Sequence, residues 1–320
     1  NDYMVYLRDY NDIVSHQFDF DAIMEKEVFR NPGWAILCYL FFYLGGFFSL
    51  VAVLNVFLNY VYYQFISHYV ERRYWPLSVF LYVTYSSLYL LNFSMMRQGL
   101  TIALFVFSWQ FMKERKWLTS LIIYLIAVQM HTSALVLLPF AFFGFLAKIN
   151  GKFVAVLFGA IFVVLFKYGN VVNEILTIFM GIEDVETYVK TYEDISYERT
   201  YGLGFVLGSI PFFVSLWYLY NNKTAENHKS IILVIISCLG AFVAPFADML
   251  PMLGRMSFYF GAYTIAAVPL TYNSIKNKNV QCVLLFLLVL LHVYSYIFFF
   301  SSSSVYGKAY AEFHTIFEVL

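Results

Sequence analysis

The amino-acid sequence predicts an all-α polytopic membrane protein, with about ten transmembrane helices in one membrane domain over residues 1–320. Of its residues, 61% are hydrophobic and only 12% are charged, and the mean hydropathy is +0.69. A soluble domain carries about 25% charged residues, so this chain lacks the side chains to cover a soluble surface. Apolar runs recur along the whole chain, and Lys and Arg gather in alternate loops between them.

The order of apolar and polar stretches predicts the individual elements. Residues 1–33 are polar, acidic and aromatic, and we expect an ordered extracytoplasmic segment there. The apolar stretch 34–46 is too short to span a bilayer, so it predicts an interfacial or re-entrant helix that ends at a Gly pair. Residues 169–202 predict an extracytoplasmic acidic and aromatic loop with short helices. The expected membrane helices lie at about residues 48–69, 76–94, 98–112, 117–130, 132–147, 153–168, 203–220, 230–247, 256–272 and 280–299.

Positive charge assigns the loops to the two sides of the membrane, because Lys and Arg accumulate in cytoplasmic loops. One set of alternate loops holds most of the basic residues and few acidic ones, whereas the other loops are acidic. We therefore expect Arg97, His131 and Arg255 to lie on the extracytoplasmic side, together with both termini. The basic residues of the cytoplasmic loops are Arg72, Arg73, Lys113, Arg115, Lys116, Lys148, Lys152, Lys223, Lys229, Lys276 and Lys278.

Two polar clusters lie at matching ends of two short apolar runs, 99–112 and 117–130, which are joined by the basic turn 113–116. We predict an antiparallel helical hairpin with Arg97 and His131 at the same end. At about 1.5 Å per residue each run is roughly 21 Å long, whereas the hydrocarbon core is about 30 Å thick. With the turn anchored at the cytoplasmic surface, both side chains would stop below the opposite surface. An intramembrane pair of this kind is by default a functional hypothesis, and the site would open outward.

The chemistry of these two side chains suits an anionic substrate. Arg97 begins a helix, where the guanidinium and free backbone N–H groups together can receive phosphate oxygens. The imidazole of His131 can take a proton from a hydroxyl or donate a hydrogen bond, and Thr132 and Ser133 follow it as possible helix caps. Two structural alternatives stay open. Arg97 would then extend to lipid headgroups, and His131 would only be a satisfied capping group.

Further candidates come from later in the chain. Arg255 precedes an apolar helix, and Tyr259 lies one turn on, on the same face. A salt bridge between Arg255 and Asp248 is the structural alternative. Tyr192 and Arg199 lie in a segment of tyrosines and carboxylates that suits sugar binding by ring stacking and hydrogen bonds. An amphipathic helix lying on the membrane would give the same pattern.

Several classes of chemistry lack a sequence signature. The chain has no nucleotide loop, Rossmann glycine pattern, HExxH or GxSxG motif. Its three cysteines fall in apolar runs without CxxC spacing, which indicates neither a disulfide framework nor a zinc site. We therefore predict no metal and no other cofactor. The basic loops are too short to form a nucleic-acid surface.

The order of motifs along the chain is DYMVY, an apolar run with a Trp, an RQGL helix, a short basic turn, HTSAL, an acidic loop with tyrosines, GLG and RMSFYF. In this order, over nearly its whole length, the chain resembles the EpsG-like family of bacterial exopolysaccharide polymerases, related to the O-antigen-type Wzy polymerases. RQG followed by HxSA is the most specific part. The resemblance implies a GT-C-like glycosyltransferase of the bacterial plasma membrane that uses no nucleotide sugar. Such an enzyme joins repeat units carried on undecaprenyl pyrophosphate at the extracytoplasmic face.

The resemblance also implies roles for single residues. It maps the catalytic arginine and histidine of the family onto Arg97 and His131, and a later arginine onto Arg255. Gln98 in RQGL and Asp2 in DYMVY are further candidates for substrate binding. The implied partners are an undecaprenyl-pyrophosphate-linked oligosaccharide, membrane lipids, and a chain-length regulator or other export components. Because residue 1 is Asn rather than Met, we expect an upstream segment, either a first helix or a signal.

The residue chemistry and the resemblance lead to one mechanism. Arg97 and Arg255 would hold the donor pyrophosphate and stabilise the charge that develops as the glycosidic bond breaks. His131 would accept the proton of the acceptor hydroxyl, or would position that hydroxyl.

Other functional classes fit part of the pattern. A flippase or transporter for lipid-linked oligosaccharides would explain ten helices, but it should carry charges along the midplane of several helices, and here they gather at one rim. A membrane O-acyltransferase that modifies the glycan could also use a histidine and an arginine. Such an enzyme takes acyl groups from the cytoplasm, which fits two outward-facing residues poorly. A structural partner in an export complex is a fourth reading.

Overall fold

The computed structural model describes residues 3–85, 88–93, 95–137, 150–167, 203–221, 228–243 and 257–301. Every regular element in these ranges is a helix, which confirms the predicted all-α class. The chain divides into two compact units, Asn1–Phe145 with Ile275–Leu320, and Leu146–Ser274. Each unit is described by itself below, and a single membrane domain over residues 1–320 stays a prediction.

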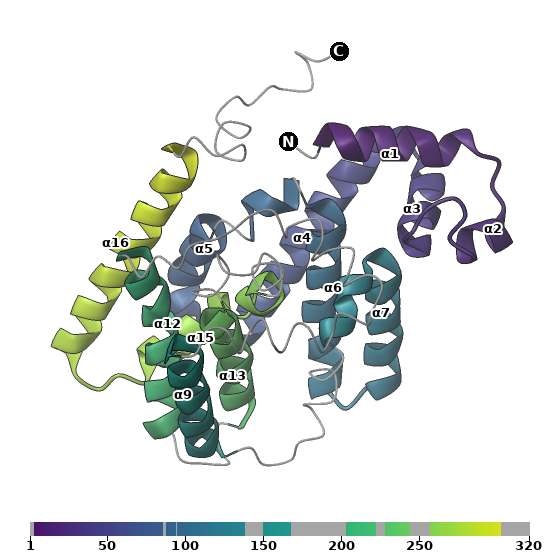
Figure 1. Ribbon diagram of the computed structural model, residues 1–320. Helices are drawn as coiled ribbons and strands as arrows, with labels where there is room; N and C mark the ends of the chain where they lie inside the picture. Colours follow the sequence, from purple (N-terminus) through teal and green to yellow (C-terminus); the bar gives the residue numbers. More distant parts are fainter. Residues whose placement is uncertain are drawn as a thin grey trace. The chain divides into compact units, whose positions relative to one another are not determined.

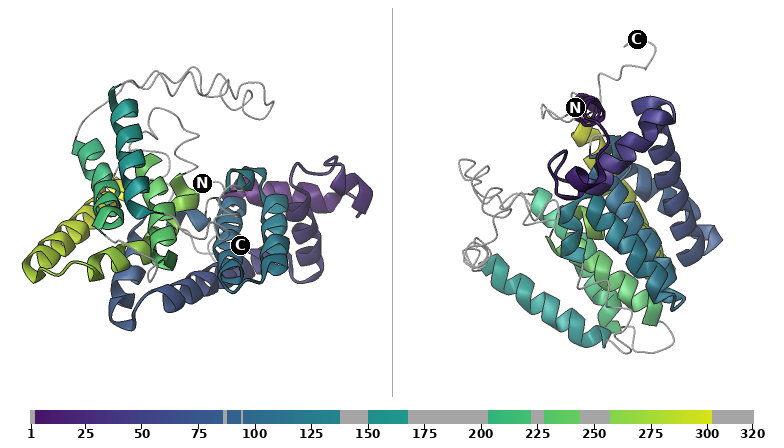
Figure 2. Two further views of the ribbon diagram at one scale, coloured as in Figure 1. Left: turned by 90° about the horizontal axis from the view of Figure 1, so that it is seen from below. Right: turned by 90° about the vertical axis from the view of Figure 1, so that its right-hand side faces the viewer.

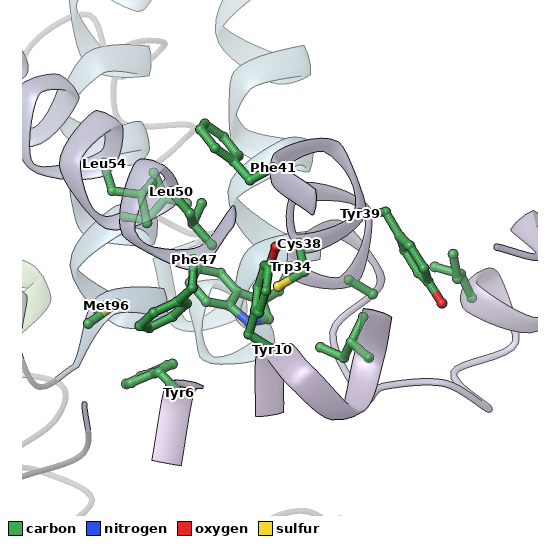
Figure 3. Packing of buried hydrophobic residues seen from close by; sticks show 14 residues of the cluster. Tyr6, Tyr10, Trp34, Cys38, Tyr39, Phe41, Phe47, Leu50, Leu54 and Met96 are labelled. Atoms are coloured by element: carbon green, nitrogen blue, oxygen red, sulfur yellow. The ribbon is translucent and has the colours of Figure 1, made fainter. Parts of the chain in front are cut away.

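The first unit begins with an ordered N-terminal segment. It contains α1 (Tyr3–Ser15), α2 (Phe20–Met24) and α3 (Pro32–Tyr43). Tyr6, Tyr10 and Ile13 are the buried residues of α1, and their spacing places them on one face of the helix. That face packs into an aromatic and aliphatic cluster with α3, α4 (Gly46–Tyr69) and the start of α6 (Met96–Lys113), as Figure 3 shows.

A Gly pair separates α3 from α4. Gly45 has φ +113° and Gly46 has φ +81°, a left-handed backbone that residues with a side chain rarely adopt. The chain therefore leaves α3 after 12 residues and enters the 24-residue α4 in a new direction. This confirms the predicted short helix that ends at the Gly pair.

The predicted hairpin is confirmed. α6 and α7 (Trp117–Met130) lie side by side, as Figures 1 and 2 show. The turn between them is tight, and Arg115 adopts a left-handed φ of +61° there. The Thr101 hydroxyl donates within α6 to the Arg97 carbonyl oxygen at 2.8 Å, and its oxygen lies 3.5 Å from the Ala127 carbonyl oxygen of α7. This close approach places Thr101 opposite Ala127 in the antiparallel pair.

The expected membrane helix at 76–94 is wrong in its extent. α5 (Trp75–Thr84) has only 10 residues, and a 3-10 helix, η2 (Leu90–Phe93), follows it. At about 1.5 Å per residue, α5 is roughly 15 Å long and cannot cross a bilayer alone. The sequence after Thr84 is rich in Ser, Tyr and Asn, whose side chains compete with helical backbone bonds or lose rotamer freedom in a helix.

Two of the described helices are long and apolar enough to cross a membrane, Gly46–Tyr69 and Lys278–Phe298. The second belongs to α16 (Lys278–Ser301), which packs against α5 in the first unit. His292 Nδ1 lies 3.4 Å from the Thr84 hydroxyl across this contact. The larger number of about ten spans stays a prediction.

The second unit is a cluster of four described α-helices: α9 (Gly151–Lys167), α12 (Leu203–Asn221), α13 (His228–Val243) and α15 (Thr264–Asn273). The Phe162 and Phe212 rings stack with their centroids 4.9 Å apart, which joins α9 to α12. A Cβ on Gly240 would lie 3.0 Å from the backbone nitrogen of Gly261, so α13 passes close to that backbone. The predicted single helix over 256–272 is wrong at this point, because a turn at 262–263 separates a helical segment at 257–261 from α15.

Gly33 allows α3 to pack tightly on the end of α7. A Cβ there would lie 2.9 Å from the Gln129 Cβ and 3.0 Å from the Gln129 carbonyl carbon. Such a contact cannot be relieved by rotating a side chain, because one of the atoms is backbone. The first turn of α3 is therefore held against the last turn of α7.

We expect Gly33→Ala to lower the free energy of unfolding by about 1–3 kcal/mol, because the added methyl group forces α3 and α7 apart. Gly159→Ala in α9 is the control, since its nearest neighbour would be Leu216 Cδ1 at 3.7 Å. That change should be neutral or stabilising by up to about 1 kcal/mol, because Ala favours a helix interior over Gly. The unfolding midpoint in detergent micelles measures both. Equal midpoints for the two variants would contradict the close packing.

Candidate functional site

Arg97 is the second residue of α6, and its side chain is enclosed by the N-terminal segment. Only 8% of the residue is exposed. Its Nη1 donates a long hydrogen bond of 3.5 Å to the Asn31 side-chain oxygen. The guanidinium carbon lies 5.2 Å from the Tyr6 ring centroid and 4.9 Å from that of Phe29. The charge is thus bracketed by two aromatic faces and one amide.

This guanidinium has no counter-charge among the residues that the structure describes. Across the described ranges no carboxylate lies within 4.0 Å of its nitrogens. Its Nε is buried and has no hydrogen-bond partner among the described residues. Burying a cation without a paired anion is costly, and natural sites retain such a residue where an anion binds.

Two helix N-termini add positive potential at the same place. α6 begins after Met95 and α3 after Asn31, and neither side chain accepts a hydrogen bond from the first turn of its helix. The first N–H groups of a helix lack partners within the helix, and the helix dipole makes this end positive. A guanidinium and two helix ends without side-chain caps form an arrangement that suits phosphate oxygens.

His131 ends α7 with an extended backbone, φ −158° and ψ 120°. Its Nδ1 accepts from the Ser133 backbone N–H at 3.2 Å and lies 2.7 Å from the Ser133 hydroxyl. Because the N–H is a donor, Nδ1 must be the acceptor, and the neutral ring carries its proton on Nε2. The capping role that the sequence left open is therefore present, since the ring holds the first turn of η3 (Thr132–Leu137).

The hairpin brings Arg97 and His131 to the same end. Thr101 contacts Ala127 across the hairpin. Arg97 lies about one turn before Thr101, and His131 lies about one turn after Ala127 in the antiparallel helix. The start of α3 contacts both helices there, through Asn31 to Arg97 and through Gly33 to the end of α7. This placement agrees with the matching ends predicted from the sequence.

The other predicted site residues divide into two groups. Gln98 is buried beside Arg97, with 3% of its surface exposed. Tyr259 is buried in the second unit, with 1% exposed, on the helical segment 257–261. The remaining candidates lie outside the described residues: Asp2, Tyr192, Arg199 and Arg255.

Sequence reasoning missed three residues that surround Arg97: Tyr6, Phe29 and Asn31. The predicted ordered, aromatic segment 1–33 was the available signal for the two rings. Asn31 precedes Pro32, a pattern that marks a helix start, so its place in the sequence pointed to a helix cap and not to a contact with Arg97. Periodicity and spacing alone could not place these residues against a helix that starts more than sixty positions later.

A metal centre has no ligand set in the described part of the chain, where no three His, Cys, Asp or Glu side chains gather. Cys38 and Cys238 are buried and Cys282 is exposed, and all three are free. The absence of a metal requirement stays a prediction.

Comparison with known proteins assigns the family. A model of the EpsG family matches residues 1–313. The chain belongs to the EpsG family. Membership confirms the resemblance seen in the motifs, and it supports a membrane protein of the polysaccharide-polymerase type. Neither a search of curated proteins nor a search of solved structures finds a match for this EpsG-family chain.

We expect ¹⁵N NMR of the protein with labelled histidine to show the Nε2–H tautomer for neutral His131, because its Nδ1 accepts from the Ser133 N–H. His16 is an internal control with the opposite expectation. Its Nδ1 lies 2.8 Å from the Asp12 carbonyl oxygen, which can only accept. Each signal is assigned by its loss in the corresponding His→Gln variant. A protonated Nδ1 in neutral His131 would show that the ring does not bond to Ser133 in this way.

Proposed function

We propose that this protein polymerises a polysaccharide by joining repeat units that are carried on undecaprenyl pyrophosphate, at the outer face of the bacterial plasma membrane. One observation carries the proposal. The Arg97 guanidinium is buried without a carboxylate partner in the described chain, beside two helix N-termini that lack side-chain caps. A lipid-linked diphosphate supplies the missing negative charge.

In the proposed reaction, an acceptor hydroxyl oxygen attacks the anomeric carbon of the donor sugar. The bond from that carbon to the diphosphate oxygen breaks, negative charge develops on the leaving diphosphate, and the hydroxyl proton passes to a diphosphate oxygen or to water. Arg97 stabilises this charge from a site of low water content, where electrostatic interactions are strong. We propose Arg255 as a second contact to the diphosphate. The donor is already activated by its diphosphate, so we propose that the step needs no metal ion.

His131 acts on the acceptor. Its contact with Ser133 supports a positioning role, because the Nδ1 lone pair is already engaged and Nε2 carries the proton of the neutral ring. An Nε2–H group donates a hydrogen bond to the acceptor hydroxyl oxygen or to the leaving diphosphate. The alternative role as a general base would need the ring to change tautomer first.

The other candidates contact the sugars and the lipid head. Gln98, next to Arg97 in α6, is proposed to bind the diphosphate. Tyr259, Tyr192, Arg199 and Asp2 are proposed to contact the repeat units by stacking and hydrogen bonds. GT-C-like architecture and a chain-length regulator or another export component as partner belong to the same proposal.

The decisive experiment incubates the purified protein with undecaprenyl-pyrophosphate-linked repeat units in lipid vesicles. Polymerisation gives a ladder of longer glycans on a gel. Transfer of the unchanged substrate across the vesicle membrane would indicate a flippase instead. Incorporation of labelled acetate into the glycan would indicate an acyltransferase.

We expect Arg97→Ala to reduce the rate of ladder formation by about a hundredfold or more, because a preorganised positive group is lost from the leaving diphosphate. Arg97→Lys should recover only part of the rate, since the ammonium lacks the planar fork of the guanidinium. Arg73→Ala is the control, because Arg73 forms an exposed ion pair with Glu71 at 2.9 Å. Full activity in Arg97→Ala, at equal protein level, would remove the proposed role.

For His131→Ala we expect slower transfer, by about a hundredfold, with donor binding retained. The ring is proposed to act on the acceptor, so the loss should appear in kcat rather than in affinity for the lipid-linked donor. Ser133→Ala should give a smaller loss of the same kind, because it removes only the hydroxyl next to Nδ1. A loss of donor binding in His131→Ala would make the residue structural.

A further inference from the structure

The side chain of Asn31 departs from the usual behaviour of a helix cap. Asn31 is the N-cap of α3, a position where an Asn side chain normally accepts from an N–H of the first turn. It makes no such bond here. Its oxygen instead lies 3.5 Å from Arg97 Nη1, and only 3% of the residue is exposed. The amide is therefore turned from its own helix toward the guanidinium.

A role as helix cap does not explain why residue 31 is a neutral Asn rather than an Asp. Asp and Asn serve almost equally well as N-caps, so the start of α3 does not require an amide rather than a carboxylate. The two differ toward Arg97. A carboxylate would form a short, charge-assisted pair with the guanidinium, whereas an amide oxygen at 3.5 Å only orients it.

The two rings that face Arg97 are uncharged as well. The Tyr6 and Phe29 rings hold the guanidinium by cation–π contact, which limits its movement without neutralising it. Nε has no partner among the described residues. The enclosure therefore fixes the position of a full positive charge and, among the described residues, leaves it without a paired anion.

We propose that Asn31 is a positioning residue that orients Arg97 and, by being neutral, makes the guanidinium selective for an external diphosphate. The inference rests on the proposed function, because it takes the diphosphate of the lipid-linked donor as the anion. Asn31 thus sets the affinity of the site for anions without itself reacting.

The test is Asn31→Asp, which keeps the shape of the side chain and adds one negative charge. The probe is inorganic pyrophosphate, titrated calorimetrically into the full chain in detergent micelles. We expect its affinity to fall about a hundredfold, because the introduced carboxylate occupies the guanidinium and repels the ligand. The unfolding midpoint should stay equal or rise, since a buried cation gains a partner. If Asn31 had only a structural role, Asn31→Asp would lower both the pyrophosphate affinity and the unfolding midpoint.

Asn277→Asp is the matched control. Asn277 caps α16, where its side-chain oxygen accepts from the N–H of Asn279 at 3.0 Å and of Val280 at 3.2 Å. The substitution makes the same change of charge at an exposed cap, and pyrophosphate affinity should be unchanged. Asn31→Ser removes the amide oxygen without adding a charge, so it should lower the affinity far less than Asn31→Asp does. In an Arg97→Gln background, Asn31→Asp should cause no further loss, because the two residues act through one contact.

The outcomes separate this inference from the proposed function. Unchanged pyrophosphate affinity in Asn31→Asp, a lower unfolding midpoint, or a wild-type protein that does not bind pyrophosphate would overturn it. A wild-type protein that binds pyrophosphate in an Arg97-dependent way, but forms no glycan ladder, would overturn the proposed polymerase and leave the role of Asn31 in place.

Discussion

Removing a guanidinium from water is the physical constraint on which the candidate site depends. An arginine at a helix start could reach the surface and stay hydrated, but Arg97 is covered by α1 and by the segment before α3. The aromatic faces of Tyr6 and Phe29 replace part of its hydration, and the amide of Asn31 replaces another part. None of these groups carries a charge. These contacts hold the guanidinium in place, but they do not neutralise its positive charge.

The packing of three helix ends gives this charge its neighbours. The short turn of the α6–α7 hairpin brings the start of one helix beside the end of the other, and Thr101 and Ala127 define their register. α3 joins them because Gly33 lets its first turn approach the last turn of α7. A helix start, a helix end and a second helix start therefore meet at one place. The start of α3 contributes the Asn31 amide, which accepts a hydrogen bond from Arg97 at the start of α6.

The sequence was sufficient for the parts of this site that depend on local patterns. Apolar runs of matched length and a basic turn predicted the hairpin, and the Gly pair predicted the end of α3. The position of Arg97 at a helix start followed from the same pattern. Contacts between distant segments could not be predicted from the sequence, because nothing in the spacing of Tyr6, Phe29 or Asn31 shows which helix they cover. The early end of α5 was missed since hydropathy continues past Thr84 while helix-forming residues do not.

The order of the elements along the chain has a consequence for biogenesis. α1, α2 and α3 are synthesised before α6, so the arginine that they enclose belongs to a helix that leaves the ribosome later. Until then the cluster that α1 and α3 form lacks Met96 and Leu100, which α6 contributes to it. The enclosure can therefore be completed only after the α6–α7 hairpin has been synthesised.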